Sequence, residues 1–514
     1  MSRALISVSD KTGLAELAGK LQEAGVEIIS TGGTASYLQA KGIDVTPVSA
    51  ITGFPEIMDG RVKTLHPKVH GGILGLRDRP AHQDEASEHG IAWIDWVIVN
   101  LYPFRSTVSK PGVTLEEAVE QIDIGGPSMV RSAAKNYRHV IILTDPRQYD
   151  PIFRLWSEGR LDESTRLQLA LAAFRHTAHY DAVIAEYLAR QTSIEGEFPE
   201  ELTMTYVKQS ELRYGENPHQ RAALYVDPLP RGLGLVQAEQ LQGKELSYNN
   251  LNDAQAAWDL LQEFERPTAV AVKHANPCGV ANGNTLEEAY RLAYQADPVS
   301  IFGGIVAVNR ELDGVTAALM SEIFLEVILA PDFSEEALRV LSGKKNLRLI
   351  RMGRQTVRTK PWQLKRLDDG LLLQTADQED LDPQNWQTAG RHQTTAEDLE
   401  QLRFAWKVVK HVKSNAIVVA NRFQTLGIGA GQMNRIDAAR IALKQAEASS
   451  QGVRGAYLAS DAFFPFGDVV KLAAEFGIRA IVQPGGSIRD QESIAAADEA
   501  GIAMMFTGQR HFRH

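Results

Sequence analysis

The chain contains a single cysteine, Cys278, among its 514 residues. A disulfide within the chain is therefore impossible, and a CxxC zinc site is excluded as well. A lone thiol is ordinary for a protein that works in a reducing compartment, so we expect a cytoplasmic location.

Long apolar runs and an excess of positive charge are also missing. No stretch approaches the roughly 20 consecutive apolar residues that a membrane-spanning helix needs, and the N-terminus runs straight into a predicted strand without a secretory apolar segment. The net charge is −10, which gives no general attraction to nucleic acid or to an anionic membrane. We therefore expect neither as a partner, and local groups would have to bind any phosphate-bearing ligand.

The composition that remains is that of an ordinary globular protein, with 44% hydrophobic and 23% charged residues. The length fits two to four domains, and predicted strands alternate with predicted helices, which is typical of the α/β class. A polar stretch at 191–201 predicts a boundary between domains 1–195 and 196–514. Residues 351–395 are polar and irregular in pattern.

Small polar loops follow the first two predicted strands, 4–8 and 26–30. The first loop carries Ser9, Asp10 and Lys11, and the second is Thr31-Gly32-Gly33-Thr34. Such loops offer backbone N–H groups and a helix N-terminus to an anion. The pair, together with Lys11, predicts a phosphate site.

A basic segment at 60–72 contains Arg61, Lys63, Lys68 and two histidines, and no carboxylate lies within it. An unpaired cluster of this kind favours an anionic ligand, although a solvated basic loop is the alternative. A buried strand at 96–99 ends at Asn100, again at a strand's carboxyl end.

Helical patterns complete the N-terminal third. Arg131 and Lys135 fall four apart, on one face of a predicted helix. From 163 to 190 the pattern is helical, and we expect its apolar, core-facing side to carry Leu167, Leu171, Phe174, Ala178 and Ile184.

The stretch Val272-Lys273-His274-Ala275-Asn276-Pro277-Cys278-Gly279 is the strongest chemical signal. It follows a short apolar run that predicts a buried strand, and we expect Asn276-Pro277 to form the turn. In an α/β sheet the carboxyl end of a strand opens onto the ligand crevice. Lys273 could hold developing negative charge there and His274 could take a proton; a buried histidine beside a surface lysine is the alternative.

Two later segments leave alternatives open. Residues 427–432 are glycine-rich and only loosely similar to a dinucleotide fingerprint, a weak signal by itself. The aromatic run 463–466 could stack a planar ligand, although filling a core is the default for aromatic residues.

Taken in order, the motifs resemble the bifunctional AICAR transformylase/IMP cyclohydrolase family over essentially the whole chain. The motifs are Ile6–Gly13, Arg61–Pro67, Gln121–Gly126, Arg213–Gly215, Lys273-His274 and Asp461–Phe466. The resemblance implies an α/β fold with an N-terminal methylglyoxal-synthase-like three-layer domain. It also implies a C-terminal transformylase of two cytidine-deaminase-like subdomains, divided at roughly 350–395.

The resemblance further implies formyl transfer from 10-formyltetrahydrofolate to the amine of aminoimidazole-carboxamide ribonucleotide, followed by dehydrative ring closure to IMP. It implies a homodimer with shared transformylase sites, no catalytic metal and, as one option, a structural monovalent cation. The implied catalytic residues are Lys273 and His274 for transfer, and Lys63, Tyr102, Asp123 and Lys135 for ring closure.

Binding roles are carried over on the same basis. The implied substrate-binding residues are Ser9, Asp10, Lys11, Thr31, Gly32, Gly33, Thr34, Arg61, Thr64, Asn100, Gly125, Gly126, Arg213, Tyr214, Phe302, Gly303, Asp332, Asn415 and Arg435. The implied folate-side residues are Ile436, Phe463, Pro465 and Arg510.

Two rival functions remain beside this expectation. One is a methylglyoxal-synthase-like lyase fused to an unrelated module, and the other is a nucleotide-sensing protein without catalysis. A zinc deaminase is excluded, because no second cysteine and no H-x-E element exist.

Overall fold

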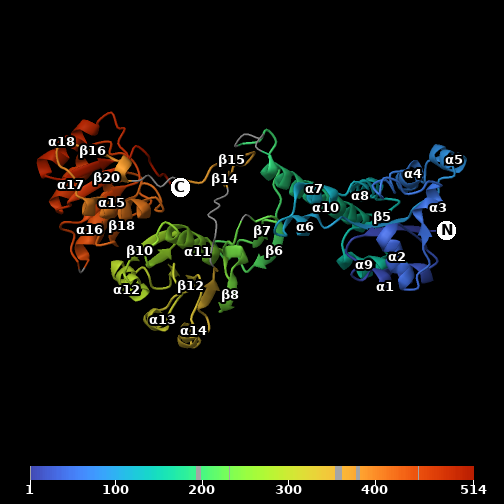
Figure 1. The fold of residues 1–514 in the computed structure, drawn as a ribbon, viewed down its shortest axis with the longest axis horizontal. Coiled ribbons are helices and arrows are strands. Elements are labelled where there is room, and N and C mark those ends of the chain that lie inside the picture. The colour runs from blue at the N-terminus through green and yellow to red at the C-terminus, as the bar shows by residue number, and fades with distance from the viewer. Residues whose placement is uncertain (1, 193–197, 231, 354–361, 378–382, 450) are drawn as a thin grey trace. The chain divides into compact units, whose positions relative to one another are not determined.

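The structure is a computed structural model that describes residues 2–192, 198–230, 232–353, 362–377, 383–449 and 451–514 (Figure 1). The chain splits into two compact units. Unit 1 comprises Met1–Val207 and Tyr225–Leu229, and unit 2 comprises Lys208–Leu224 and Pro230–His514. The domain boundary expected at residue 195 falls within 193–197, which lie outside the described residues. In the described part of the chain, no helix is long and apolar enough to cross a membrane.

Unit 1 is built on a five-stranded sheet in the order β3-β2-β1-β4-β5, with every pair parallel. The central strands are nearly continuous apolar runs because both faces of a parallel sheet are covered; every residue of β4, Trp96–Asn100, is buried. The elements are β1 (Arg3–Val8), α1 (Leu14–Glu23), β2 (Glu27–Ser30), α2 (Gly32–Ala40), β3 (Thr46–Pro47), α3 (Val48–Thr52), α4 (Pro67–Leu74), α5 (Pro80–Glu88), β4, α6 (Phe104–Val108), α7 (Leu115–Glu120), α8 (Gly125–Lys135), β5 (Ile141–Leu143), α9 (Tyr149–Ser157) and α10 (Glu163–Gln191).

Helix α10 forms where it was predicted but buries a different face. Leu167, Leu171 and Phe174, which we expected in the core, are 53%, 49% and 39% exposed. The helix instead buries a stripe that includes Ala173 and Tyr180. The prediction was wrong because apolar residues occupy more than one side of this helix. The Tyr180 hydroxyl can be buried because it accepts from the N–H of Asp123 and donates to a backbone carbonyl.

A short segment distant in sequence completes unit 1. Leu229 is 6% exposed and belongs to the hydrophobic core of this unit. Its carbonyl accepts from Arg190 Nη2 at 2.7 Å, and the carbonyl of Pro228 accepts from Arg105 Nε at 2.8 Å. The core therefore continues past the point at which the chain leaves α10.

Unit 2 contains a twelve-stranded mixed sheet in the order β16-β21-β20-β19-β17-β18-β10-β9-β11-β12-β13-β8. Two small sheets, β6–β7 and β14–β15, are separate from it. The elements from β6 on are β6 (Val207–Leu212), β7 (Ala222–Val226), β8 (Glu239–Gln242), α11 (Tyr248–Leu261), β9 (Thr268–Lys273), β10 (Asn276–Asn282), α12 (Leu286–Ala296), β11 (Ile305–Val308), α13 (Gly314–Ser321), β12 (Val327–Ala330), α14 (Glu335–Leu341), β13 (Arg348–Arg351), β14 (Gln363–Arg366), β15 (Leu371–Gln374), β16 (Gln387–Ala389), α15 (Ala396–Val409), β17 (Ile417–Asn421), β18 (Gln424–Gly429), α16 (Arg435–Ala448), β19 (Tyr457–Ser460), α17 (Asp468–Glu475), β20 (Ala480–Gln483), α18 (Asp490–Ala500) and β21 (Ala503–Phe506).

The large sheet is an internal duplication. Its first half runs β8-β13-β12-β11-β9-β10 and its second half runs β16-β21-β20-β19-β17-β18. Both halves follow the same sequence of pairings, antiparallel, parallel, parallel, antiparallel, antiparallel. They meet where β10 pairs with β18 through Ala281 and Gln424. The expected pair of similar subdomains is therefore present in the topology.

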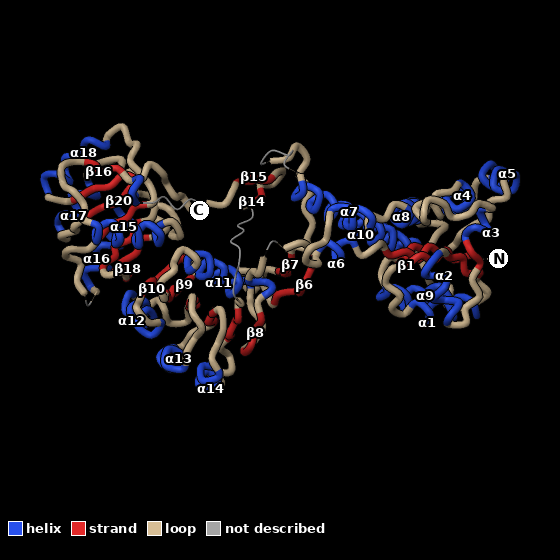
Figure 2. Tube along the Cα trace, in the orientation of Figure 1, coloured by secondary structure: helices blue, strands red, loops and turns tan. Residues whose placement is uncertain are grey.

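The two faces of this sheet pack into different hydrophobic clusters. Side chains such as Val270 and Val272 of β9 pack with α11 and α15 in one cluster that spans both halves. Their neighbours Ala269 and Ala271 pack with α12, α13 and α14 on the opposite face (Figure 2). The second half has its own cluster with α16, α17 and α18. Alternate residues of a strand point to opposite faces, which produces this layered arrangement.

The strongest sequence motif lies on a hairpin, which differs from the expectation. Lys273 pairs with Asn276 across an antiparallel turn, so His274 and Ala275 form the turn and Asn276-Pro277 begin β10. We expected the turn at Asn276-Pro277, but two residues with positive φ suffice for a tight hairpin. Strand β9 is also antiparallel to both of its neighbours.

Glycines set the distance between helix and sheet in both halves. A Cβ on Gly427 of β18 would lie 1.9 Å from the carbonyl oxygen of Ala442 in α16, and one on Gly279 of β10 would lie 2.1 Å from that of Ala293 in α12. The glycine-rich segment 427–432 is thus a strand and the turn after it, and close packing explains Gly427 without any phosphate contact.

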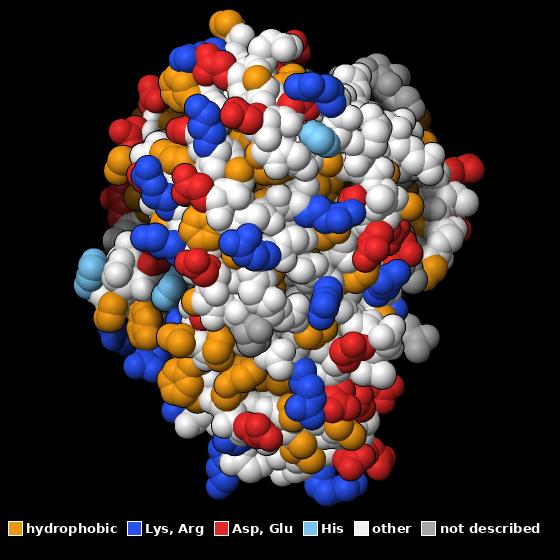
Figure 3. Space-filling model, turned by 90° about the vertical axis from the view of Figure 1, so that its left-hand side faces the viewer, with side chains coloured by type: hydrophobic (Ala, Val, Ile, Leu, Met, Phe, Trp, Pro, Cys, Tyr) orange, Lys and Arg blue, Asp and Glu red, His pale blue; other side chains and the backbone are white. Residues whose placement is uncertain are grey.

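Charge is mixed over the surface that Figure 3 shows. Lys and Arg side chains are interspersed with Asp and Glu on this face, with hydrophobic side chains scattered among them. The net charge of −10 is therefore not expressed as one acidic area there.

We predict that Gly427→Ala destabilises the chain, because the added methyl group would overlap the α16 backbone. Overpacking of this kind costs about 1–3 kcal/mol of unfolding free energy, measurable by urea denaturation. Gly343→Ala is the control, since a Cβ there would meet nothing within 4 Å. Equal stabilities for the two variants would contradict the packing argument.

Candidate functional site

The first group of predicted residues gathers at the carboxyl edge of the parallel sheet in unit 1. Asn100, at the end of β4, accepts the backbone N–H of Ser9 at 2.7 Å and of Asp10 at 2.9 Å. Its side-chain amide donates back to the Asp10 carbonyl at 3.1 Å. The neighbouring ends of β1 and β4 are therefore held together by one buried amide.

Some hydroxyl and carboxyl groups in these loops form hydrogen bonds within the protein. The Thr34 hydroxyl is buried and both accepts from Val8 N and donates to Val8 O. Asp10 accepts from the Thr12 hydroxyl and backbone N–H, and these bonds lower the pKa of its carboxyl group. Lys11 lies 6.0 Å from the Tyr37 ring centroid.

The basic segment comes close to these loops. A Cβ on Gly32 would lie 3.3 Å from Lys63 Nζ, and one on Gly125 would lie 2.8 Å from the Thr64 hydroxyl. Lys63 also forms a 3.3 Å ion pair with Glu56. Arg61 pairs with Glu120 at the surface. The side chains of Lys63 and Thr64 thus lie close against the backbone of Gly32 and Gly125, where a larger residue would have little room.

Asp123 is the carboxylate of this group whose pKa is raised. It accepts from Gly126 N at 2.8 Å and from the backbone of Tyr102. Burial raises the pKa of Asp123, and the two backbone hydrogen bonds oppose that shift only in part. A carboxyl group whose pKa lies above the usual range is suited to carry a proton.

Lys135 does not join these residues within one chain. It ends α8, which begins at Gly125, so about 15 Å of helix separates the two positions. Lys135 and Arg131 instead border a cleft of about 640 Å³ with Leu167, Leu171 and Phe174. These are the α10 side chains that we expected in the core.

The second group lies around the β9–β10 hairpin of unit 2. The Lys273 ammonium donates to the Phe302 carbonyl at 2.5 Å, and it lies 3.8 Å from the position of a Cβ on Gly303. Gly303 has φ 71° and donates its N–H to the Phe324 carbonyl at 2.7 Å. A backbone conformation that favours glycine therefore forms one wall beside the lysine.

His274 is exposed at the tip of the same hairpin. Both turn residues have positive φ, 53° for His274 and 58° for Ala275. Asp253 of α11 accepts both of their backbone N–H groups, at 3.0 and 2.8 Å. The sequence analysis did not single out Asp253.

A link to the second half follows directly after the turn. Asn276 Oδ1 accepts from the backbone N–H of Lys413 at 3.0 Å. The loop after Lys413 leads to Asn415, whose side-chain oxygen accepts from Arg435 Nη2 at 2.6 Å. The guanidinium of Arg435 also contacts Asp461, which is fully buried. The hairpin, Asn415 and Arg435 therefore form a connected group.

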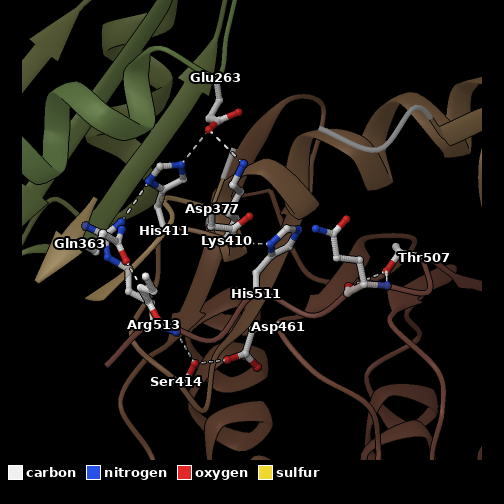
Figure 4. Close-up of polar contacts among 12 residues, drawn as sticks. Glu263, Gln363, Asp377, Lys410, His411, Ser414, Asp461, Thr507, His511 and Arg513 are labelled. Atoms are coloured by element: carbon white, nitrogen blue, oxygen red, sulfur yellow. Dashed lines mark hydrogen bonds and ion pairs between the residues drawn. The ribbon is translucent and has the colours of Figure 1, made fainter. Parts of the chain in front are cut away.

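The C-terminal tail is tied into the same loop (Figure 4). Ser414 Oγ donates to Asp461 at 2.5 Å and accepts from Arg513 N at 3.0 Å. Arg513 donates to His411 Nδ1 at 3.1 Å, so the other ring nitrogen of His411 donates to Glu263 at 3.0 Å. The tail is docked through charged and polar groups.

The folate-side residues of the resemblance lie in the second half of unit 2. Phe463 is 37% exposed beside Pro465, whereas Phe464 is fully buried. The Arg510 guanidinium lies 4.7 Å from the Phe512 ring centroid. Ile436 is partly buried against the core of this half.

The loop that begins at Arg213 is held by a hydrogen bond to α11. Asn249 donates to the Glu216 carbonyl at 3.2 Å, which ties this loop to the first turn of α11. The Arg213 guanidinium lies 5.2 Å from the Tyr214 ring centroid.

Asp332 lies at a different edge of the sheet from His274. Val272, near the end of β9, pairs with Ile305, and Ile305 pairs with Val327 at the start of β12. The start of β12 therefore lies at the same edge of the sheet as the hairpin. Asp332 follows the far end of β12 and accepts from Arg351 Nε at 2.8 Å. Within one chain, the structure does not bring Asp332 to the lysine–histidine turn.

Glu326, which the sequence analysis missed, occupies the edge where Lys273 lies. Its N–H donates to Gly304 O at 3.0 Å, and its carboxylate accepts from Asn250 at 2.8 Å. A signal was available, because Glu326 directly precedes a buried strand that neighbours β11. Among the described residues, no group of three or more His, Cys, Asp or Glu side chains is placed to hold a metal ion.

The chain is similar to known proteins. The AICARFT/IMPCHase bienzyme family matches residues 133–445, and an MGS-like domain matches residues 13–128. The bifunctional purine biosynthesis protein PurH of Thermoanaerobacter sp. (strain X514) is 55% identical over 100% of this chain and 99% of its own length. PurH of Halalkalibacterium halodurans is 53% identical with the same coverage. A crystal structure of ForH, 38% identical, covers 37% of this chain and 97% of its own, with a TM-score of 0.34 that is too low to compare folds.

These matches define a bifunctional α/β enzyme that is both a transferase and a hydrolase of purine biosynthesis. The chain belongs to the AICARFT/IMPCHase bienzyme family. It catalyses the last two steps of IMP synthesis, formyl transfer to aminoimidazole-carboxamide ribonucleotide and closure of the ring. The family uses nucleotide and formyl-tetrahydrofolate substrates. A lyase fused to an unrelated module is not favoured, and neither is a non-catalytic sensor.

We predict that Asp123→Asn stabilises the chain at pH 7, because it removes a carboxylate that burial penalises. Since the folded-state pKa is raised, wild-type stability should fall as the pH rises from the unfolded pKa through the higher folded pKa. Unfolding midpoints measured by calorimetry between pH 4 and pH 7 should fall less with rising pH in Asp123→Asn than in the wild type. Asp84→Asn, on exposed α5, is the control and should leave the profile unchanged. A lower midpoint for Asp123→Asn at pH 7 would contradict the prediction.

Proposed function

We propose that the two activities are divided between the two parts of the chain, with ring closure in 1–195 and formyl transfer in 196–514. The MGS-like match at 13–128 lies in unit 1 and supports the first assignment. The observation that carries the second is the hairpin of unit 2, which presents an ammonium and an imidazole on consecutive residues.

For formyl transfer, we assign His274 as the general base. The substrate amine is conjugated to its ring and is a weak nucleophile until its proton is removed. As the amine nitrogen attacks the formyl carbon, His274 takes the amine proton, directly or through the neighbouring carboxamide. The exposed position of His274 at the hairpin tip leaves its ring accessible to substrate.

Lys273 is assigned to the charge that develops on the formyl group. Its ammonium is anchored by the Phe302 carbonyl and has further N–H donors for the oxyanion. When the tetrahedral intermediate collapses, the bond to the folate nitrogen breaks and that nitrogen is protonated. Arg213, Tyr214, Phe302, Gly303, Asn415 and Arg435 are assigned to the nucleotide, and Ile436, Phe463, Pro465 and Arg510 to the folate.

Ring closure is assigned to the group at the carboxyl edge of the unit 1 sheet. The carboxamide nitrogen attacks the new formyl carbon and water leaves, so the enzyme mainly holds the two groups in reacting orientation. Asp123, with its raised pKa, and Tyr102 would move protons while Lys63 stabilises the oxygen. Ser9, Asp10, Lys11, Thr31, Gly32, Gly33, Thr34, Arg61, Thr64, Asn100, Gly125 and Gly126 are assigned to nucleotide binding.

A homodimer with shared transformylase sites would account for residues that one chain leaves apart. Lys135, to which we assign proton transfer in ring closure, lies a helix length from Asp123, and Asp332 lies at another sheet edge from His274. The exposed α10 side chains Leu167, Leu171 and Phe174 form an apolar area of the kind that marks interfaces. A second copy could cover this area and supply the missing groups.

The remaining proposals concern conditions and location. We propose 10-formyltetrahydrofolate as the formyl donor, chemistry without a catalytic metal, and a monovalent cation with a structural role. We also propose a cytoplasmic location, which the single thiol favours.

We predict that His274→Ala lowers the rate of formyl transfer by about a hundredfold to ten-thousandfold, the usual contribution of a general base. Ring closure, assayed with formylated nucleotide supplied directly, should be unchanged because its groups lie in unit 1. His392→Ala is the matched control, since His392 contacts the Asp498 carbonyl and not the hairpin. Normal transfer by His274→Ala would refute the assignment.

We predict that a fragment ending at residue 195 closes the ring but does not transfer formyl. A fragment ending at residue 229 should do the same and unfold at a higher temperature, because it keeps buried Leu229; burying a leucine side chain is worth about 1.5–3 kcal/mol. Absorbance assays of each half-reaction and thermal melts would test both statements. Formyl transfer by either fragment would overturn the division of activities.

A further inference from the structure

The turn that carries His274 has a counterpart in the duplicated half of unit 2. Arg422 and Phe423 form the turn between β17 and β18, with φ of 51° and 57°. His274 and Ala275 occupy the same place between β9 and β10, with φ of 53° and 58°. None of these residues is glycine, so both turns need support from neighbouring groups.

That support comes from equivalent helical positions. Asp253 is the sixth residue of α11 and Gln401 the sixth of α15, two helices of 14 residues that both begin with a capping box. Gln401 Oε1 accepts the N–H of Phe423 at 3.1 Å, just as Asp253 accepts the N–H of Ala275 at 2.8 Å. The duplication therefore identifies the two side chains as counterparts.

The two halves differ in what this side chain does. Asp253 uses its second oxygen to accept the His274 N–H at 3.0 Å. In the second half, a neutral amide is enough to hold a turn of the same shape. A carboxylate is the more costly choice at this position, because burial raises the pKa of Asp253 while the N–H bonds and His274 act against that shift. The need to hold the turn therefore does not explain why Asp253 is a charged residue.

The carboxylate contacts the backbone of the proposed base. Of the ionisable groups around Asp253, His274 favours its ionised form and Glu326 disfavours it. When His274 accepts a proton from the substrate amine, a nearby carboxylate stabilises the imidazolium that forms. The same carboxylate fixes the backbone from which the imidazole projects.

We propose that Asp253 is a positioning residue for formyl transfer: its carboxylate holds the His274 turn through both N–H groups and stabilises the protonated imidazole. This inference rests on the proposed role of His274. In the step it serves, the amine proton moves to His274, the nitrogen lone pair forms the bond to the formyl carbon, and the folate nitrogen leaves.

The test is kinetic and uses the full-length chain. Asp253→Asn and Asp253→Gln, the latter copying the second half, should lower kcat for formyl transfer about tenfold to a hundredfold, the scale expected when a reacting group is misplaced. KM for the nucleotide should stay within about twofold, and ring closure should be unaffected. Gln401→Asp, the reverse change in the counterpart, should leave kcat unchanged.

A double-mutant cycle separates this role from a general loss of structure. On a His274→Ala background, Asp253→Asn should cause no further loss, because the group it positions is absent. An equal further loss on that background would overturn the proposal, as would a kcat within about twofold of the wild type for both Asp253 variants. If His274→Ala alone leaves transfer intact, the assignment of the base has failed, which is a separate result.

Discussion

The pairing of β10 with β18 is the contact on which unit 2 depends. It joins two copies of one topology into a single twelve-stranded sheet and lets α11 and α15 share one hydrophobic cluster. Because β10 begins at Asn276, the same contact places the β9–β10 hairpin against the Lys413 loop. Residues almost 140 positions apart in sequence thus reach one location through sheet geometry.

Neighbouring groups decide what each buried carboxylate can do. Asp398, almost fully buried, accepts from Arg479 and from the Tyr457 hydroxyl, and these partners hold its pKa well below the usual range. Asp123 has only backbone N–H partners among the causes that lower its pKa, so burial dominates and raises it. The first carboxylate is a fixed anion that joins α15 to neighbouring elements, whereas the second is able to exchange a proton. Burial alone would not distinguish them.

Much of this organisation could be predicted from the sequence, and the failures have physical reasons. The βα order, most strands and the lysine–histidine motif were recognisable because apolar periodicity and polar strand ends are local features. The buried face of α10 was not, since two stripes of that helix are apolar and tertiary contacts choose between them. Asp253 and Glu326 were missed because their roles come from pairings that no local pattern contains. Alignment of the two halves, Ser247–Asp253 with Thr395–Gln401, was the available signal for Asp253.

Duplication also bears on how the molecule can change. The turn at Arg422 and Phe423 has the positive φ angles of its counterpart but carries no histidine. Arg422 is exposed, so its side chain can be replaced without loss of packing, whereas Phe423 packs against the hydrophobic cluster that both halves share. One chain therefore holds two turns of the same shape, and the second offers an exposed position, Arg422, at which a new side chain could be introduced.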